Sequence, residues 1–71
     1  MKKYLVVIEK AAKNYSAYSP DLPGCVATGR TVAETRREFK KALAVHLELL
    51  REHGQAIPRA ESQALYVLTP R

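Results

Sequence analysis

Apolar and polar positions along the chain predict four strands and one long helix. Residues 3–10 are apolar on both faces, which is typical of a strand inside a sheet rather than at its edge. Residues 15–19 alternate aromatic with small or hydroxylated side chains, and only a short connection separates them from the first strand. The two segments are therefore expected to form an antiparallel hairpin. Residues 25–28 and 64–69 are predicted to be the remaining strands.

The helix is predicted over residues 32–53. Thr31 is suited to the N-cap, and Glu34, three residues later, completes a capping box for the first backbone N–H groups. Gly54 fits the left-handed position that follows a helix. At 100° per residue, one side of the helix is apolar and the other is charged. The apolar stripe comprises Val32, Phe39, Ala42, Leu43, His46, Leu47, Leu49 and Leu50.

The predicted order is β-β-β-α-β, an α+β domain in which one long helix covers one face of a small antiparallel sheet. A helix is about 10 Å wide, whereas four strands span roughly 19 Å, so the helix cannot cover both faces. Tyr4, Val6 and Ile8 point to one face of the sheet and Leu5 and Val7 to the other, so both faces are apolar. Val45 and Leu49 also widen the apolar stripe of the helix beyond what one sheet face can cover. We therefore expect a homo-oligomer, most simply a homodimer, to bury the face that the helix leaves open.

Length and composition indicate one soluble domain, residues 1–71. The hydrophobic fraction of 46% argues against disorder. Apolar runs are too short for the roughly 20 residues that span a bilayer, so the chain is expected to be cytoplasmic and without membrane contact. Cys25 is the single cysteine, which excludes an internal disulfide and favours a small buried side chain.

The net charge of +5 favours a nucleic acid or an acidic protein surface as partner. The basic residues are spread along the sequence, however, and only Arg36 to Lys41 is dense. Nucleic-acid footprints usually cluster, so a solvated helix face is the preferred interpretation.

No arrangement of residues predicts catalysis. His46 lies within the apolar stripe and is interpreted as a packed side chain, and His53 in the last turn as a partner of the helix dipole. The two lie about 10 Å apart along the axis, too far to share a metal. The glycines match neither dinucleotide-binding nor phosphate-binding motifs. We therefore expect no enzyme activity, no cofactor and no metal.

The most distinctive segment joins the second and third strands. Its members are Pro20, Asp21, Leu22, Pro23, Gly24 and Cys25. The prolines fix φ, the aspartate can bond nearby backbone, and the glycine can adopt the positive φ of a type II turn. Gly29, Thr31 and Glu34 follow at the entry to the helix. On physical grounds alone, this is a well-made connection between two strands.

The P-D-L-P-G-C turn, followed by a short strand and an acid-bearing amphipathic helix, resembles the HicB-like antitoxin family over residues 4–58. The resemblance implies a partial, catalytically degraded ribonuclease-H-like fold. It also implies that the chain binds and masks HicA, a small RNA-cleaving toxin. The turn and helix-entry residues match the family's structural signature, whereas no motif identifies the toxin-contacting residues.

Two departures from the family pattern keep alternatives open. Many members carry a C-terminal DNA-binding module, but here a single predicted strand follows Pro58, so direct DNA binding is not expected. The basic charge is also unexpected in a partner for a basic toxin. The alternatives are an RNA-binding module and an orphan HicB-like adaptor domain that has no toxin partner.

Overall fold

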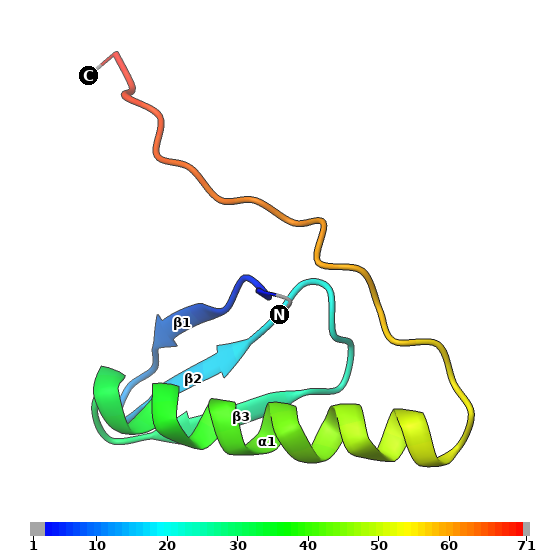
Figure 1. Cartoon of the computed structure of the whole chain (residues 1–71). Coiled ribbons are helices and arrows are strands. Elements are labelled where there is room, and N and C mark those ends of the chain that lie inside the picture. Colours follow the sequence, from blue (N-terminus) through cyan, green and yellow to red (C-terminus); the bar gives the residue numbers. More distant parts are fainter. Residues whose placement is uncertain (1–2, 71) are drawn as a thin grey trace.

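Three antiparallel strands followed by one helix make up the fold of this chain. The computed structural model describes residues 3–70, so the ends of the predicted domain, residues 1–2 and 71, lie outside the described residues. The elements are β1 (Val7–Lys10), β2 (Tyr15–Tyr18), β3 (Val26–Gly29) and α1 (Val32–Glu52). Figure 1 shows the helix lying along one face of the sheet, and the residues after it leaving the domain. The α+β class is confirmed, while the ribonuclease-H-like detail stays a prediction.

The sheet is a meander in the order β1-β2-β3. One row across the sheet comprises Ile8, Ala17 and Ala27. This row packs with Phe39 of α1 in the core. The neighbouring row, Val7, Tyr18 and Val26, faces the opposite way because side chains alternate along a strand. Val26 is 66% exposed, so the helix leaves this apolar row uncovered, as the sequence predicts.

Helix α1 begins where the sequence predicts. The Thr31 hydroxyl accepts a hydrogen bond from the Glu34 N–H at 3.0 Å, and the Glu34 carboxylate accepts one from the Arg30 N–H. Gly54 follows the helix with φ of 66°, the left-handed conformation expected of it. Val32 departs from the predicted stripe: it is 50% exposed, while Thr35 takes the buried place in the first turn.

The core is small and depends on the turn between β2 and β3. The buried apolar side chains are Ala17, Leu22, Cys25 and Phe39. Two of these, Leu22 and Cys25, belong to that turn rather than to a helix or strand. Tyr4, Val6 and Ile8, from β1 and the residues before it, pack against this core cluster. The turn is therefore part of the hydrophobic core as well as a connection.

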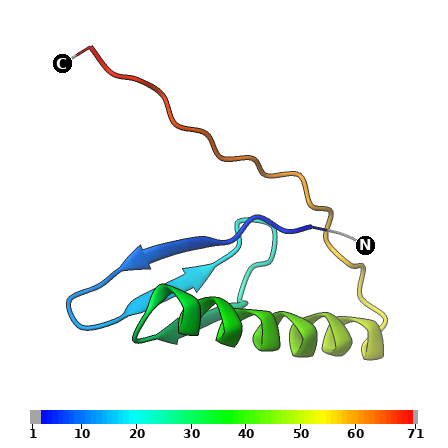
Figure 2. The same ribbon diagram turned by 60° about the vertical axis from the view of Figure 1, so that its left-hand side comes forward.

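The structure does not form the fourth strand that the sequence predicts over residues 64–69. These residues have no regular secondary structure, and they pair with no strand among residues 3–70. Figures 1 and 2 both show the segment running away from the sheet. A strand exists only beside a neighbour, so an apolar pattern alone is not sufficient. The first strand is also shorter than predicted, because residues 3–6 lie outside the paired register of β1.

Candidate protein-binding surface

Residues 20–25 form a turn that inserts two side chains into the core. Leu22 and Cys25 are almost completely enclosed, and backbone hydrogen bonds join Leu22 N–H to Ser19 and Cys25 N–H to Leu22, with N···O distances of 3.1 and 3.2 Å. Gly24 has φ of 84°, as the turn requires. Burial raises the pKa of the Cys25 thiol, which favours a neutral packed side chain over a reactive thiolate.

Asp21 joins this turn to the segment that follows the helix. Its carboxylate accepts hydrogen bonds from the Ser62 N–H at 3.0 Å, the Ser62 hydroxyl at 2.8 Å and the Glu61 N–H at 3.2 Å. The bond from the Ser62 N–H is the main reason that the pKa of Asp21 is lowered. Nearby, the Tyr4 hydroxyl donates to the Pro58 carbonyl at 2.7 Å. Residues 58–62 are therefore anchored to the domain.

Replacing Asp21 by alanine is expected to release this anchor. The Glu61 and Ser62 amides should exchange with solvent at least tenfold faster, while the amides of α1 keep their protection. Because the pKa of Asp21 is lowered from 3.8, the anchor is complete above that value and weakens as the pH falls through the lower, folded-state value. Amide hydrogen exchange followed by NMR measures both effects. Glu38→Ala, which removes an exposed carboxylate from α1, is the control, and unchanged exchange in Asp21→Ala would contradict the role of Asp21.

Gly29, Thr31 and Glu34 build the contact between β3 and the start of α1. A Cβ atom at Gly29 would lie 2.7 Å from the backbone N of Thr35 and 2.9 Å from its Cα. Thr35 itself is completely buried, and its hydroxyl donates to the Thr31 carbonyl at 2.7 Å. The Arg30 N–H, and then its guanidinium, lower the pKa of Glu34. These contacts fix the start of the helix against β3.

A groove lies between β3 and α1, with a volume of about 560 Å³. Its lining comprises residues 24–28 on one side and Glu38, Lys41, Ala42, Val45, His46 and Leu49 of the helix on the other. Val45 is 60% exposed and Leu49 is 48% exposed. One rim of this β3–α1 groove is the open edge of β3, which pairs only with β2 within residues 3–70. The groove therefore offers apolar side chains and unpaired backbone groups together.

A second, smaller hollow on α1 continues the exposed apolar surface toward the helix end. Val45 and Leu49 line it beside two acids, Glu48 and Glu52. Glu48 also forms an ion pair with Arg51 at 2.9 Å. We call Val45, Glu48, Leu49 and Glu52 the acidic helix face. Sequence reasoning recognised the breadth of the apolar stripe here, but not that it is bordered by acids on an open surface.

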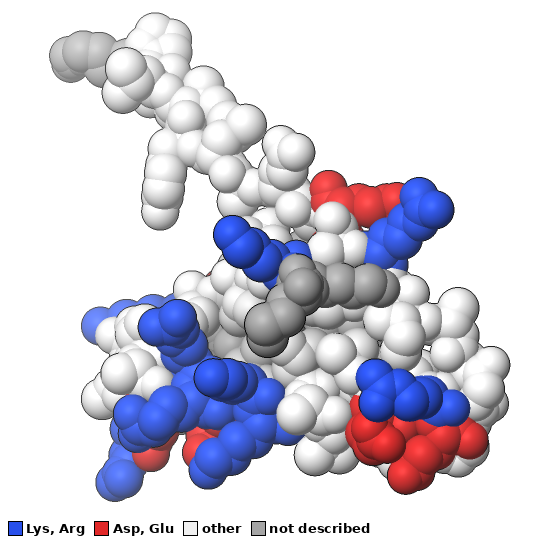
Figure 3. Space-filling view, in the orientation of Figure 1, with Lys and Arg blue, Asp and Glu red and all other residues white. Residues whose placement is uncertain are grey.

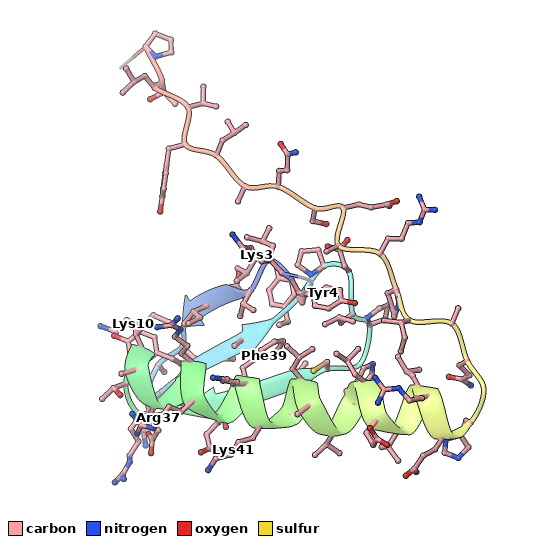
Figure 4. All side chains as sticks on the ribbon, viewed as in Figure 1. Lys3, Tyr4, Lys10, Arg37, Phe39 and Lys41 are labelled. Atoms are coloured by element: carbon pink, nitrogen blue, oxygen red, sulfur yellow. The ribbon has the colours of Figure 1, made fainter. Side chains whose placement is uncertain are left out.

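Basic side chains gather at the other end of the domain, where α1 begins beside the β1–β2 connection (Figure 3). Figure 4 labels Lys10, Arg37 and Lys41 toward this end. Arg36, Arg37 and Lys40 line a hollow of about 370 Å³ there. The sequence shows the dense run Arg36 to Lys41, interpreted above as a solvated helix face, and folding adds Lys10 from the end of β1 to it. We call Lys10, Arg36, Arg37 and Lys40 the basic end.

The two histidines lie on different parts of the helix surface, and His46 lies outside the core cluster in which the sequence predicts it to pack. His46 is half-buried in the wall of the groove, and the His53 Nδ1 lies 2.8 Å from the Leu49 carbonyl oxygen at the end of α1. Among residues 3–70, no three His, Cys, Asp or Glu side chains are placed to hold a metal ion. Within the same residues, no helix has the length and apolar character needed to cross a membrane.

Comparison with known families and proteins gives consistent matches. A family model described as the HicB-like antitoxin of bacterial toxin–antitoxin systems matches residues 4–70. A UPF0150 protein of Thermoplasma acidophilum is 35% identical over 66 residues, which are 92% of this chain and 96% of the relative. An uncharacterized protein from the rep-hol intergenic region of Haemophilus phage HP1 is 31% identical over 67 residues, 94% of this chain. The chain spans 50% of the length of that phage protein.

A solved structure shares the fold. A chain of the HicA3 and HicB3 toxin-antitoxin complex superposes with a TM-score of 0.72 and 32% sequence identity. The match covers 84% of the chain described here and 70% of the other. It confirms the arrangement of strands and helix.

Proposed function

The chain belongs to the HicB-like antitoxin family, and from this premise we propose that it binds a HicA-type RNA-cleaving toxin and neutralises it by direct protein–protein masking. The observation that carries the proposal is the similarity to a chain solved in a toxin–antitoxin complex, at 32% identity and a TM-score of 0.72. Fold similarity alone does not define a function. Here the family is one of antitoxins, and the structural neighbour was solved in a toxin–antitoxin complex. Both support an antitoxin role.

We place the toxin contact on the β3–α1 groove and the adjoining acidic helix face. Binding hot spots are apolar side chains set in pockets and surrounded by polar groups, and Val45 and Leu49 line both hollows of this surface. Glu48 and Glu52 border them. A basic, RNA-binding toxin would meet complementary charge here. The basic end lies at the opposite end of the helix from Glu48 and Glu52 (Figure 3), and Lys41 is the basic residue that lines the groove itself.

Co-expression with the neighbouring small open reading frame tests the proposal. The neighbour is expected to arrest growth when it is expressed alone, to be harmless with this chain present, and to co-purify with it. Purified toxin should cleave RNA, and addition of this chain should stop the cleavage. A neighbour without toxicity, or a toxin that neither co-purifies with the chain nor is inhibited by it, would overturn the proposal.

RNA binding at the basic end is the second candidate function, and the gathering of charge seen in Figure 3 is the observation that favours it. Contacts to phosphates release counterions, so binding should weaken steeply between about 50 and 200 mM salt. Fluorescence anisotropy with a labelled RNA measures this dependence. Arg37→Glu should abolish such binding and leave toxin neutralisation intact. An absence of RNA binding even at low salt removes this candidate, and an absence of both activities leaves the orphan adaptor domain.

A further inference from the structure

The first strand lies at the edge of the sheet, although its sequence is that of an inner strand. Within residues 3–70, β1 pairs with β2 alone. Residues 4–8 are apolar on both faces and are only half-buried. Soluble proteins usually protect a sheet edge with charges, proline or a bulge, and Glu9 and Lys10 place charges on the second half of β1. Residues 4–8, which lead into β1 and form its first half, carry no charge, so this part of the edge is apolar.

The space beside this edge is hollow on the side of the helix. Tyr4, Val6 and Ile8 line one wall of a cavity of about 370 Å³, and Phe39 and Leu43 of α1 line the other. A second hollow, of about 570 Å³, continues along α1 and shares Tyr4 and Leu43 with the first. A strand added next to residues 4–8 would point alternate side chains over these hollows. The edge thus has a receptive apolar surface as well as unpaired backbone groups.

Residues 64–68 have the features of the missing strand. They are five consecutive apolar residues, Ala-Leu-Tyr-Val-Leu, the same length as the apolar stretch Tyr-Leu-Val-Val-Ile of residues 4–8. Leu65 is 75% exposed and Tyr66 is fully exposed. No backbone hydrogen bond joins these residues to any other part of residues 3–70. The chain therefore exposes an apolar segment, residues 64–68, and an apolar sheet edge, and each could bury the other.

The segment is directed away from its own sheet. Asp21 holds Ser62 just before the segment, and Figures 1 and 2 agree that the chain then runs outward. In both views the segment and β1 run toward the same side of the picture, but the segment stands clear of the sheet. The chain would have to bend toward the sheet after the anchored Ser62 to bring the segment beside its own β1. In the structure the segment is therefore free of its own sheet and open to a second molecule.

We propose that residues 64–69 of one chain add as a fourth strand to the open β1 edge of a second copy, which returns the same contact. Each copy carries both the segment and the edge that it fits, so the exchange closes as a two-fold dimer. Each copy then contributes Leu65, Tyr66, Val67 and Leu68 to the shared interface, all of which are exposed in the single chain. The four-stranded sheet that the sequence indicates is completed between two chains.

Proline substitutions in the segment test the exchange by sedimentation equilibrium. The wild-type chain is expected to have twice the 8.0 kDa mass of one chain. Proline lacks the backbone N–H that would bond to the neighbouring strand. Successive N–H groups in a strand point to opposite sides, so only one of two adjacent residues donates to β1 of the second copy. Val67→Pro and Leu68→Pro are therefore both made. At least one should raise the dissociation constant tenfold or more. Gln63→Pro, placed before the strand, is the matched control and should dimerise normally. A monomeric wild type, or two proline variants that dimerise as tightly as wild type, would overturn the proposal.

Hydrogen exchange of the purified chain tells which molecule receives the segment. Amides of residues 64–69 are expected to be protected at high concentration and to lose protection on dilution, in parallel with dissociation of the dimer. Protection that does not change with concentration would assign the segment to its own sheet and overturn the exchange. Protection that appears only after toxin is added would assign it to the toxin, with the same consequence.

Discussion

Replacing Gly29 by alanine is expected to lower the free energy of unfolding by about 3 kcal/mol, the upper part of the usual range for overpacking. The added methyl group would lie 2.7 Å from the Thr35 backbone N and 2.9 Å from its Cα. These atoms belong to the first turn of α1, so they cannot swing aside as a flexible side chain does. Relief of the contact requires β3 and α1 to separate. In a domain of this size, we expect the midpoint of thermal unfolding to fall by roughly 15 °C.

Gly24→Ala provides the matched comparison, because the same methyl group is added for a different physical cost. A Cβ atom at Gly24 meets no atom within 4 Å, but the residue has φ of 84°. Its substitution should therefore cost only the strain of a left-handed residue, about 1–2 kcal/mol. Urea unfolding monitored by circular dichroism measures both variants. If Gly29→Ala were as stable as wild type, the conclusion that β3 and α1 are in close contact at Gly29 would be wrong.

These two glycines illustrate what the sequence can predict. The positive φ of Gly24 follows from its place after Pro23, and the capping bond of Thr31 follows from the glutamate three residues later, because both depend on neighbours in the chain. The contact of Gly29 with Thr35 depends on how a strand and a helix pack together. Local rules therefore predict the turn and the start of the helix. They do not predict that only a glycine fits at position 29.

The same distinction applies to the candidate surfaces. The bond from Ser62 to Asp21 joins residues 41 positions apart, and no local pattern indicates it. Arg36, Arg37 and Lys40 of the basic end are already close in the sequence, and only Lys10 is added by folding, where the end of β1 lies beside the start of α1 (Figures 3 and 4). The apolar pattern of residues 64–69 predicts a strand, but among the described residues no strand lies beside it, so the prediction of a fourth strand within the single chain is wrong.

Replacing Val45 by lysine is expected to weaken toxin binding about 100-fold, which corresponds to the loss of a hot-spot contact of about 2.7 kcal/mol. Val45 is 60% exposed, so the substitution removes little from the core, and lysine is a good helix former. In the complex, the new charge would lie within the desolvated contact and would repel a basic toxin. Growth rescue should fail, and isothermal titration calorimetry with purified toxin should give the change in affinity.

Val32→Lys is the matched control, because it makes the same substitution on the same helix. Val32 is 50% exposed and lies at the first residue of α1, away from the groove. Its variant should bind the toxin as wild type does, and both variants should keep the wild-type circular dichroism spectrum. Equal binding by Val45→Lys and wild type would exclude the β3–α1 groove as the toxin contact. Since Val45 lines neither hollow beside the β1 edge, Val45→Lys should also keep the dimer mass, which separates toxin binding from strand exchange.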